Sequence, residues 1–296
     1  MSVIDSHTHI FPPEFSVRRE TYLQRDAWFG QLYADPRASM ASAEELIAEM
    51  DRSGVDVSVA FGFAWADQGL CRAANDYVLA AVSRWPQRLV GFAVVNPAAP
   101  GALAELERCV AAGLRGLGEL MPDGQGYSLD DPRLDELLAH MALWHRPTLI
   151  HAGEPIGHPY PGKSRSTLEP FYELARRHPN ATLVAAHWGG GLVFYELMPK
   201  VRQVLRNVYY DTAASLYLYQ DDVFALAARI APRKVLFATD YPLIGQGRFL
   251  GRVRRAGLAA SDLDAVLGGN AARLLRAADL NGGDVNDGDD SGLRGH

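Results

Sequence analysis

The sequence predicts an α/β fold, a single closed (β/α)8 (TIM) barrel. Eight short runs rich in Val, Ile, Leu and Phe alternate with segments of helical periodicity. Strict alternation of strand and helix implies parallel pairing through right-handed crossovers, and eight such units favour a closed barrel. A doubly wound open sheet is the competing architecture, but no Gly-x-Gly-x-x-Gly turn follows the first run. The strands are expected at residues 3–9, 55–61, 89–95, 114–120, 148–151, 182–187, 208–211 and 235–240.

Capping residues mark several of the predicted helices. Ser42 and Glu45 are spaced as a capping box, and Gly54 fits the position just past the end of that helix. Asp131 followed by Pro132 is typical of an N-cap with proline at the first helical position. Further helices are expected at residues 70–85, 102–112, 192–205 and 221–230, with helical pieces continuing to about residue 278.

Three glycines accompany the fourth predicted strand, at positions 113, 116 and 118. Their spacing does not match the phosphate-binding pattern of a dinucleotide fold. We interpret them as packing positions within the strand, where a missing side chain lets neighbouring elements approach.

One barrel domain is predicted over residues 1–278. Residues 10–41 read as a long irregular segment with many aromatic residues, and loops of this length inside a compact domain are usually functional or disordered. The aromatic content favours an ordered lid over a flexible tether. The tail at 279–296 is rich in Gly and Asp without periodicity and is predicted to be disordered.

Composition narrows the classes of partner. The 296 residues are 48% hydrophobic and 22% charged, with a formal net charge of −6 and no Lys/Arg cluster, which argues against nucleic-acid and membrane partners. Two cysteines, Cys71 and Cys109, do not make a disulfide framework and are expected to be buried free thiols. With neither a secretory signal nor a membrane-spanning run visible, a soluble cytoplasmic protein acting on a small molecule is predicted. Homo-oligomerisation is left open.

Polar residues occur at the carboxyl ends of five predicted strands, which is the end where barrels of this kind build active sites. Singly, each has an ordinary explanation: a hydrogen-bonded core histidine, a turn aspartate, or a glutamate paired with Arg115. Together they can satisfy one divalent cation, and imidazole with carboxylate suits zinc, with manganese, iron or cobalt as alternatives. The candidate metal ligands are His7, His9, Glu119, His151, His187 and Asp240.

Five motifs together resemble the amidohydrolase superfamily, in particular its amidohydrolase-related branch of metal-dependent hydrolases and decarboxylases. The resemblance spans nearly the whole chain. The motifs are Asp5-Ser6-His7-Thr8-His9, Leu149-Ile150-His151, Ala186-His187-Trp188-Gly189-Gly190, Ala238-Thr239-Asp240-Tyr241-Pro242 and Gly269-Asn270-Ala271-Ala272-Arg273-Leu274.

The resemblance implies that His7, His9, His151 and Asp240 bind a metal ion. In one-metal members the histidine that ends strand six acts on the substrate, which would make His187 catalytic. In two-metal members that histidine is a ligand, and a strand-four lysine or glutamate bridges the two ions. Glu119 lies at about that position, and no lysine does, so one or two ions remain open.

The chemistry of such a site predicts a metal-dependent hydrolase acting on an ester, lactone or amide. Asp240 would take the proton of an activated water, and His187 or the metal would polarise the carbonyl. The alternative is a nonoxidative decarboxylase on the same scaffold. A nuclease and a barrel without catalysis are weaker alternatives. Lys163 and Arg165 could pair with a substrate carboxylate or be solvated loop charges.

Overall fold

Eight parallel strands form the centre of the molecule in the computed structural model, which describes residues 2–165 and 168–277. The strands pair in chain order, each with the next. They are β1 (Ile4–His9), β2 (Val57–Phe61), β3 (Leu89–Ala93), β4 (Gly116–Leu120), β5 (Thr148–Ile150), β6 (Leu183–Ala185), β7 (Val208–Asp211) and β8 (Val235–Leu236).

The barrel closes between β1 and the segment after β8. The amide of Ser6 donates to the carbonyl oxygen of Phe237 at 2.8 Å, and the amide of His9 donates to that of Tyr241 at 2.7 Å. The amide of Asp240 donates back to the carbonyl oxygen of His7 at 3.1 Å. These bonds confirm the predicted α/β (β/α)8 architecture and bring His7 and His9, near the start of the chain, beside Asp240.

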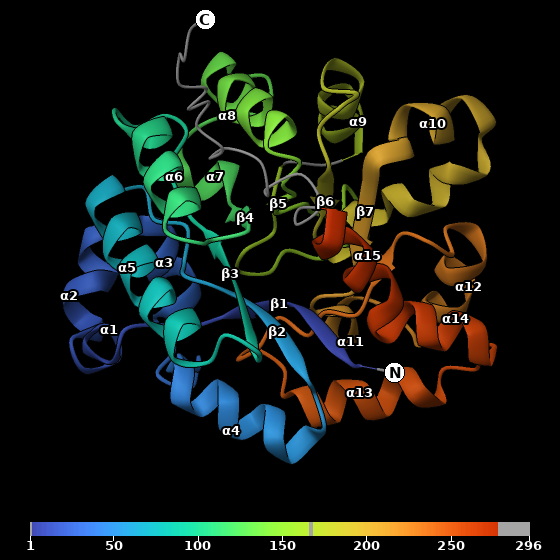
Figure 1. Ribbon diagram of the computed structural model, residues 1–296, viewed down its shortest axis with the longest axis horizontal. Helices are drawn as coiled ribbons and strands as arrows, with labels where there is room; N and C mark the ends of the chain where they lie inside the picture. Colours follow the sequence, from blue (N-terminus) through green and yellow to red (C-terminus); the bar gives the residue numbers. More distant parts are fainter. Residues whose placement is uncertain (1, 166–167, 278–296) are drawn as a thin grey trace, which may run out of the picture.

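Helices surround the strands on the outside of the barrel (Figure 1). The α-helices are α1 (Pro13–Val17), α2 (Arg19–Arg25), α3 (Ala27–Tyr33), α4 (Ala43–Ser53), α5 (Gln68–Arg84), α6 (Ala102–Ala111), α7 (Pro122–Gln125), α8 (Pro132–Leu143), α9 (Leu168–Arg177), α10 (Pro199–Val204), α11 (Ser215–Leu218), α12 (Asp222–Ile230), α13 (Gln246–Arg255), α14 (Ala260–Asp264) and α15 (Asn270–Ala277). Short 3₁₀ and π segments are η1 (His187–Leu197), η2 (Leu205–Asn207) and η3 (Ala265–Gly269).

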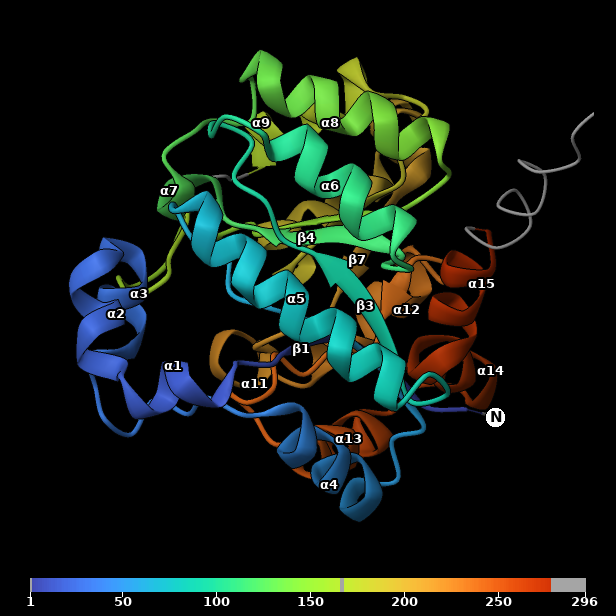
Figure 2. The same ribbon diagram turned by 60° about the vertical axis from the view of Figure 1, so that its left-hand side comes forward.

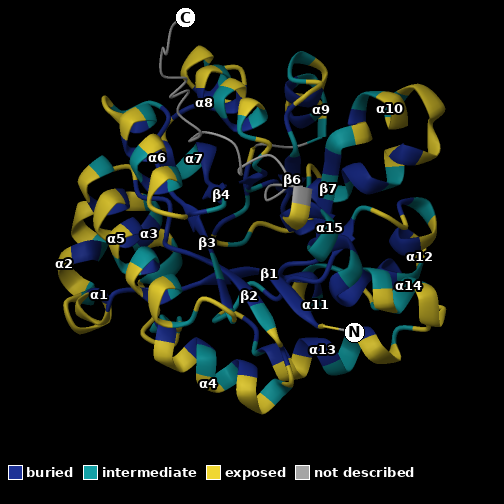
Figure 3. Ribbon diagram, viewed as in Figure 1, coloured by how far each residue is buried: buried dark blue, intermediate teal, exposed yellow. Residues whose placement is uncertain are grey.

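Burial follows this arrangement: the strands are buried, and exposed residues lie on the outer faces of the helices (Figure 3). Inside the barrel, Val59, Phe92, Leu149, Val184 and Leu236 make an apolar layer with almost no free volume. This layer provides a rigid, dry base for polar side chains at the carboxyl ends of the strands.

Two of the predicted capping patterns are confirmed. Ser42 and Glu45 form the reciprocal capping box of α4, and Gly54 ends that helix with a left-handed φ of 73°. The Asp131 side chain accepts a hydrogen bond from the amide of Arg133 at the start of α8. Both cysteines are buried free thiols, as expected. In the described parts of the chain, no helix is long and apolar enough to cross a membrane.

The sixth and eighth strands are shorter than predicted. They stop at Ala185 and Leu236, and the chain then turns through left-handed backbone conformations, with φ of 53° at His187 and 63° at Asp240. The helix predicted over 192–205 is also wrong in part. A 3₁₀ segment begins at His187 with non-helical residues at 188–191, and Pro199 starts a separate short helix, α10.

The sequence predicted an irregular segment over residues 10–41, and this prediction is wrong. The structure has three short helices there, α1, α2 and α3. These three helices lie together on one side of the barrel (Figure 2). Their aromatic side chains hold them in place: the rings of Phe15 and Phe29 lie 5.3 and 4.5 Å from that of Trp65. Trp28 of α3 packs on Gly124 of α7, where an added Cβ would come within 2.5 Å of the indole. The role of a lid stays a prediction, and the predicted disordered tail at 279–296 lies outside the described residues.

The glycines of the fourth strand have different roles. A Cβ on Gly116 would lie 2.5 Å from the ring of Phe92, and one on Gly118 would lie 2.2 Å from the carbonyl oxygen of Leu149, so both are packing positions. Gly113 precedes the strand and has no neighbour within 4 Å of the added Cβ. Its interpretation as a packing position is wrong; its φ of 108° is what requires glycine.

The substitution Gly118→Ala is expected to lower the free energy of unfolding by about 3 kcal/mol or more, because the new methyl group meets backbone atoms that cannot move aside. Gly113→Ala is the matched control, since it has a similar positive φ but open space, and should cost about 1 to 2 kcal/mol. Urea denaturation measures both. Equal losses for the two variants would contradict the close-packing explanation.

Candidate metal centre

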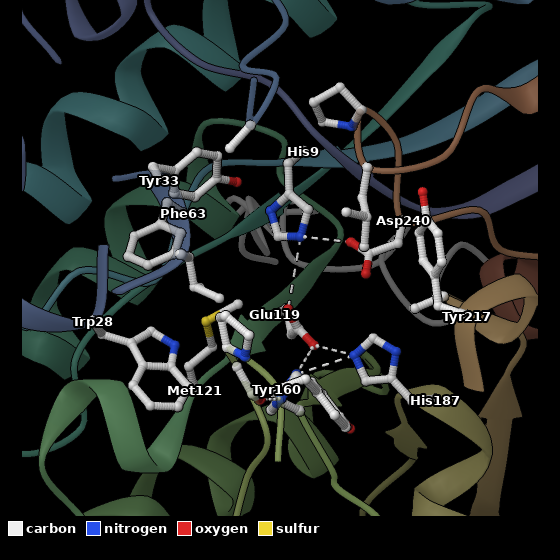
Figure 4. A pocket seen from close by; sticks show the side chains of 18 of the residues that line it. His9, Trp28, Tyr33, Phe63, Glu119, Met121, Tyr160, His187, Tyr217 and Asp240 are labelled. Carbon is white, nitrogen blue, oxygen red and sulfur yellow. Dashed lines mark hydrogen bonds and ion pairs between the residues drawn. The ribbon is translucent and has the colours of Figure 1, made fainter. Parts of the chain in front are cut away.

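The six predicted ligands converge at the carboxyl ends of the strands. His7 and His9 lie two residues apart on β1, so their side chains leave the strand on the same side. Glu119 is on β4, His151 directly follows β5, and His187 and Asp240 lie on the turns that follow β6 and β8. Figure 4 shows His9, Glu119, His187 and Asp240 facing one another across the base of a cavity. All six side chains are buried or nearly so.

His7, His9 and Asp240 form one group of three. The Nε2 atoms of the two imidazoles are 3.2 Å apart. The Oδ1 atom of Asp240 lies 3.5 Å from each of these nitrogens. Their spacing would allow one cation to contact all three side chains.

Glu119, His151 and His187 form a second group. His151 Nδ1 lies 3.1 Å from His187 Nε2 and 2.9 Å from Glu119 Oε1. The same Glu119 oxygen is 3.6 Å from His187 Nε2. This trio has the size and donor chemistry of a second cation site.

Glu119 connects the two groups because its carboxylate has one oxygen on each side. Oε1 faces the pair just described, and Oε2 lies 3.6 Å from His7 Nε2 and 3.7 Å from His9 Nε2. The structure therefore brings all six predicted residues into one cluster. Arg115 is not the partner of Glu119: its guanidinium donates to the carbonyl oxygen of Leu275 at 3.0 Å.

Hydrogen bonds on the outer side of the rings determine where the imidazole protons lie. His187 Nδ1 faces the carbonyl oxygen of Ala213 at 3.1 Å, and His151 Nε2 faces that of Gly162 at 2.9 Å. Since a carbonyl oxygen only accepts, these outer nitrogens carry the protons in the neutral rings. The inner nitrogens then present lone pairs toward one another.

The outer nitrogen of His7, Nδ1, also carries the proton, because it lies 2.8 Å from the accepting Oδ2 of the buried Asp211. For these three histidines the inner nitrogens therefore carry lone pairs, which face two carboxylates. His9 Nδ1 is buried without a hydrogen-bond partner among the described residues, so no outer acceptor fixes the proton of that ring. Such a buried, electron-rich set is costly unless cations or protons occupy it. The donor set fits divalent metal ions.

The interactions between these imidazoles and carboxylates also shift their pKa values. Burial lowers the pKa of His7, but the charge of Glu119 and the neighbouring carboxylates outweighs it and raises that pKa well above its ordinary value. The pKa of His187 rises to about 9 for the same reason. Burial raises the pKa of Glu119 and Asp240, but the imidazoles outweigh it, holding the first well below its usual range and the second at about 2.

Sequence reasoning missed the role of Asp211, which positions two ligands at once. Besides its bond to His7, its Oδ1 accepts hydrogen bonds from the amides of His187 at 2.8 Å and Ala213 at 3.1 Å. The signal was available, because Asp211 is also a polar residue at the end of an apolar strand. Asp211 accepts hydrogen bonds from two of the ligands and is not itself in either group that could hold a cation.

Asp5 has a similar supporting role beneath the site. Its carboxylate accepts hydrogen bonds from the amides of His7 and Thr239, the hydroxyl of Thr239 and the side-chain amide of Gln246. Burial raises its pKa to about 6, although each of these donors lowers it. Asp5 thereby ties β1 to the turn that carries Asp240.

Lys163 and Arg165, for which the sequence left open a substrate carboxylate partner or a solvated loop position, make contacts within the protein. The Nζ atom of Lys163 donates to the carbonyl oxygen of Gly157 at 2.9 Å, and Arg165 forms an ion pair with Asp123 at 2.9 Å. Of the two tyrosines after strand seven, Tyr217 lines the cavity. The interpretation of Lys163 and Arg165 as carboxylate partners is therefore not supported.

A cavity of about 310 Å³ opens above the ligands. Tyr33 of α3 is on its wall, where burial and the charges of Asp240 and Glu119 raise the pKa of the phenol far above its usual range, so the hydroxyl stays neutral. In addition to Tyr33 and the ligands, the cavity is lined by Trp28, Leu32, Ala38, Ser39, Phe63, Met121, His158, Tyr160, Pro161, Gly162, Ala214, Tyr217, Leu218, Pro242 and Leu243.

The fold and this cluster define the class of metal-dependent (β/α)8 enzymes. The family model described as Amidohydrolase matches residues 4–277, and the chain belongs to this metal-dependent family. Its members act on small molecules.

Solved structures with the same fold include decarboxylases and hydrolases. The 5-carboxyvanillate decarboxylase of Sphingomonas paucimobilis is 21% identical, with a TM-score of 0.76 over 93% of this chain and 99% of that one. A dihydroxybenzoic acid decarboxylase from Polaromonas sp. JS666 with bound manganese is 17% identical, with a TM-score of 0.69 over 93% and 97%. A probable 2-pyrone-4,6-dicarboxylic acid hydrolase from Acinetobacter baumannii is 16% identical, with a TM-score of 0.64 over 93% and 100%.

The substitution Asp211→Asn is expected to weaken metal binding about 10- to 100-fold, because the amide cannot hold the His7 proton and both backbone amides as the carboxylate does. Competition with a chromogenic chelator measures the affinity. Asp135→Asn is the matched control, since it removes another Asp–imidazole contact, the 2.6 Å pair with His178, outside the cluster. An equal loss in both variants would contradict a positioning role for Asp211.

Metal binding should release protons. Below about pH 9 the cation-free His187 is an imidazolium with protons on both ring nitrogens, and a metal ion must displace the proton on the inner nitrogen. From pH 7 to 9 the affinity should therefore rise about tenfold per pH unit for each proton released. Calorimetry in two buffers of different ionisation enthalpy counts the protons. Binding without proton release at pH 7 would contradict the raised pKa.

Proposed function

We propose that the protein is a hydrolase that uses two divalent cations to cleave a small ester, lactone or amide. One observation carries the proposal: the Glu119 carboxylate has one oxygen on the His7/His9 side and the other on the His151/His187 side. A residue that served a single cation would not need to face both groups.

In this proposal His7, His9 and Asp240 hold one cation, His151 and His187 hold the other, and Glu119 is shared. The bound cations would lower the pKa of water toward neutrality and polarise a substrate carbonyl. The imidazole-rich donor set favours zinc, while manganese, iron and cobalt have the same kinds of ligand. The assignment makes His187 a ligand, and its alternative role as a catalytic group belongs to a one-cation centre.

Asp240 is the proposed proton acceptor. Its carboxylate is at the cavity floor, is ionised because its pKa is held at about 2, and has one oxygen facing the ligands of the first group. It can orient the attacking water, accept its proton and return that proton to the leaving group.

The proposal predicts two equivalents of metal per chain in elemental analysis of the purified protein. Glu119→Gln should reduce the content to one equivalent or less, because the amide cannot bridge two cations. Glu136→Gln, an exposed position on α8, is the matched control and should keep both. One equivalent in the wild-type protein would overturn the two-cation proposal.

The substitution Asp240→Asn should reduce kcat by about a thousandfold or more while the His151/His187 group still binds a cation, because the amide cannot accept the proton. Hydrolysis of 4-nitrophenyl esters and lactones by the metal-loaded variant provides the measurement. Near-normal turnover would show that Asp240 is not the proton acceptor.

A decarboxylase is the second candidate. The decarboxylases among the similar structures favour it, and a one-cation centre would leave His187 free to act on a carboxylate-bearing substrate. One series of assays separates the two functions. The decarboxylase would be favoured if the protein released carbon dioxide from aromatic carboxylic acids and did not hydrolyse esters, lactones or amides. It would also be favoured by a content of one equivalent of metal.

A further inference from the structure

The walls of the cavity above the ligands are largely apolar. α3 supplies Trp28 and Leu32, the segment after β2 supplies Phe63, and Met121 and Leu243 follow β4 and β8. Figure 4 shows Trp28, Phe63 and Met121 on one side of the cavity and Tyr217 on the other. None of the described lining residues is a lysine or an arginine.

Cations close to the rim are already engaged with the protein. Arg19 donates to the carbonyl oxygens of Asp35 at 3.2 Å and Ala38 at 2.7 Å, so it braces the rim from outside the cavity. Lys163 and Arg165 are held by the contacts described above. No described lysine or arginine is therefore placed inside the cavity to pair with an anion on a bound substrate.

On the opposite wall, Tyr160 separates the cavity from one anion and one cation, because the ammonium of Lys163 lies 5.8 Å from the centroid of its ring without lining the cavity. The hydroxyl of Tyr160, a lining residue, donates to the carboxylate of Glu154 at 2.5 Å. A carboxylate carried by the body of a substrate would lose its hydration here and gain no compensating partner, which is costly.

The wall does offer an uncharged hydrogen-bond donor. The ring of Tyr33 stacks on Phe29 at 4.5 Å and meets the edge of Phe11 at 5.5 Å, so its position is fixed by packing. Its hydroxyl points toward His9 in Figure 4, on the wall of the cavity. This group can bind a neutral acceptor on the substrate.

We propose that the substrate is an electrically neutral, largely apolar ester, lactone or amide, with no anionic group other than any that forms at the reacting bond. The inference rests on the proposed function, because it assumes that the polar end of the substrate lies at the cations. It adds the chemistry of the other end: aromatic or aliphatic, uncharged, and small enough for a cavity of about 310 Å³.

Two hydroxamates that differ only at the far end test the proposal by binding. Hexanohydroxamic acid ends in a methyl group, and the monohydroxamate of adipic acid ends in a carboxylate. Both present the same chelating group to the cations. The ratio of their dissociation constants on the metal-loaded protein therefore measures how the far wall of the cavity discriminates between a methyl group and a carboxylate. We expect the neutral compound to bind about 30-fold more tightly or better.

Leu32→Arg supplies the missing cation on the cavity wall and should reduce this preference at least about tenfold. Leu143→Arg is the matched control, because it adds the same charge at an exposed position on α8 outside the cavity, and it should leave the ratio unchanged. Circular dichroism of both variants checks that the fold is retained.

Each outcome has a defined meaning. A ratio within about threefold, or a preference for the carboxylate, would overturn the inference while leaving the two-cation hydrolase intact. Failure of both hydroxamates to bind the metal-loaded protein would overturn the proposed function, and the inference with it. Preferential binding of the neutral compound, lost in Leu32→Arg and kept in Leu143→Arg, would support the inference.

Discussion

The repulsion among buried lone pairs and carboxylates is the constraint on which the site depends. Three of the imidazoles have outer acceptors that hold their protons away from the cluster, and Glu119 and Asp240 add negative charge from within it. A folded chain can keep these groups at 3 to 4 Å only if positive charge is supplied. The protein does so with protons when cation-free and, by our proposal, with metal ions when active.

Barrel closure is what brings these groups together from opposite ends of the sequence. The backbone bonds that join β1 to the segment after β8 place His7 beside Asp240, and Asp5 reinforces that seam through Thr239 and Gln246. The ligands therefore stand at the seam where the barrel closes. Their geometry is a property of the barrel rather than of any one loop.

Much of this could be predicted from the sequence because the relevant rules are local. Alternating apolar runs predict strands, and polar residues at strand ends predict a shared site. The left-handed turns at His187 and Asp240 could not be predicted, since non-glycine residues adopt them only when tertiary contacts impose the conformation. The helices at 13–33 were missed because each is too short to show a clear period, and burial of Phe15 and Phe29 against Trp65 stabilises them instead.

Part of the cavity wall comes from a different element than the ligands do. The ligands stand on the barrel strands or on the turns that follow them, whereas Trp28, Leu32 and Tyr33 come from α3, a helix between β1 and β2 that packs on the barrel through its own aromatic contacts. Mutations in that helix can reshape the chamber without disturbing the reacting groups. Lineages that exchange or lengthen this one segment could thus evolve new specificities while inheriting an unchanged catalytic core.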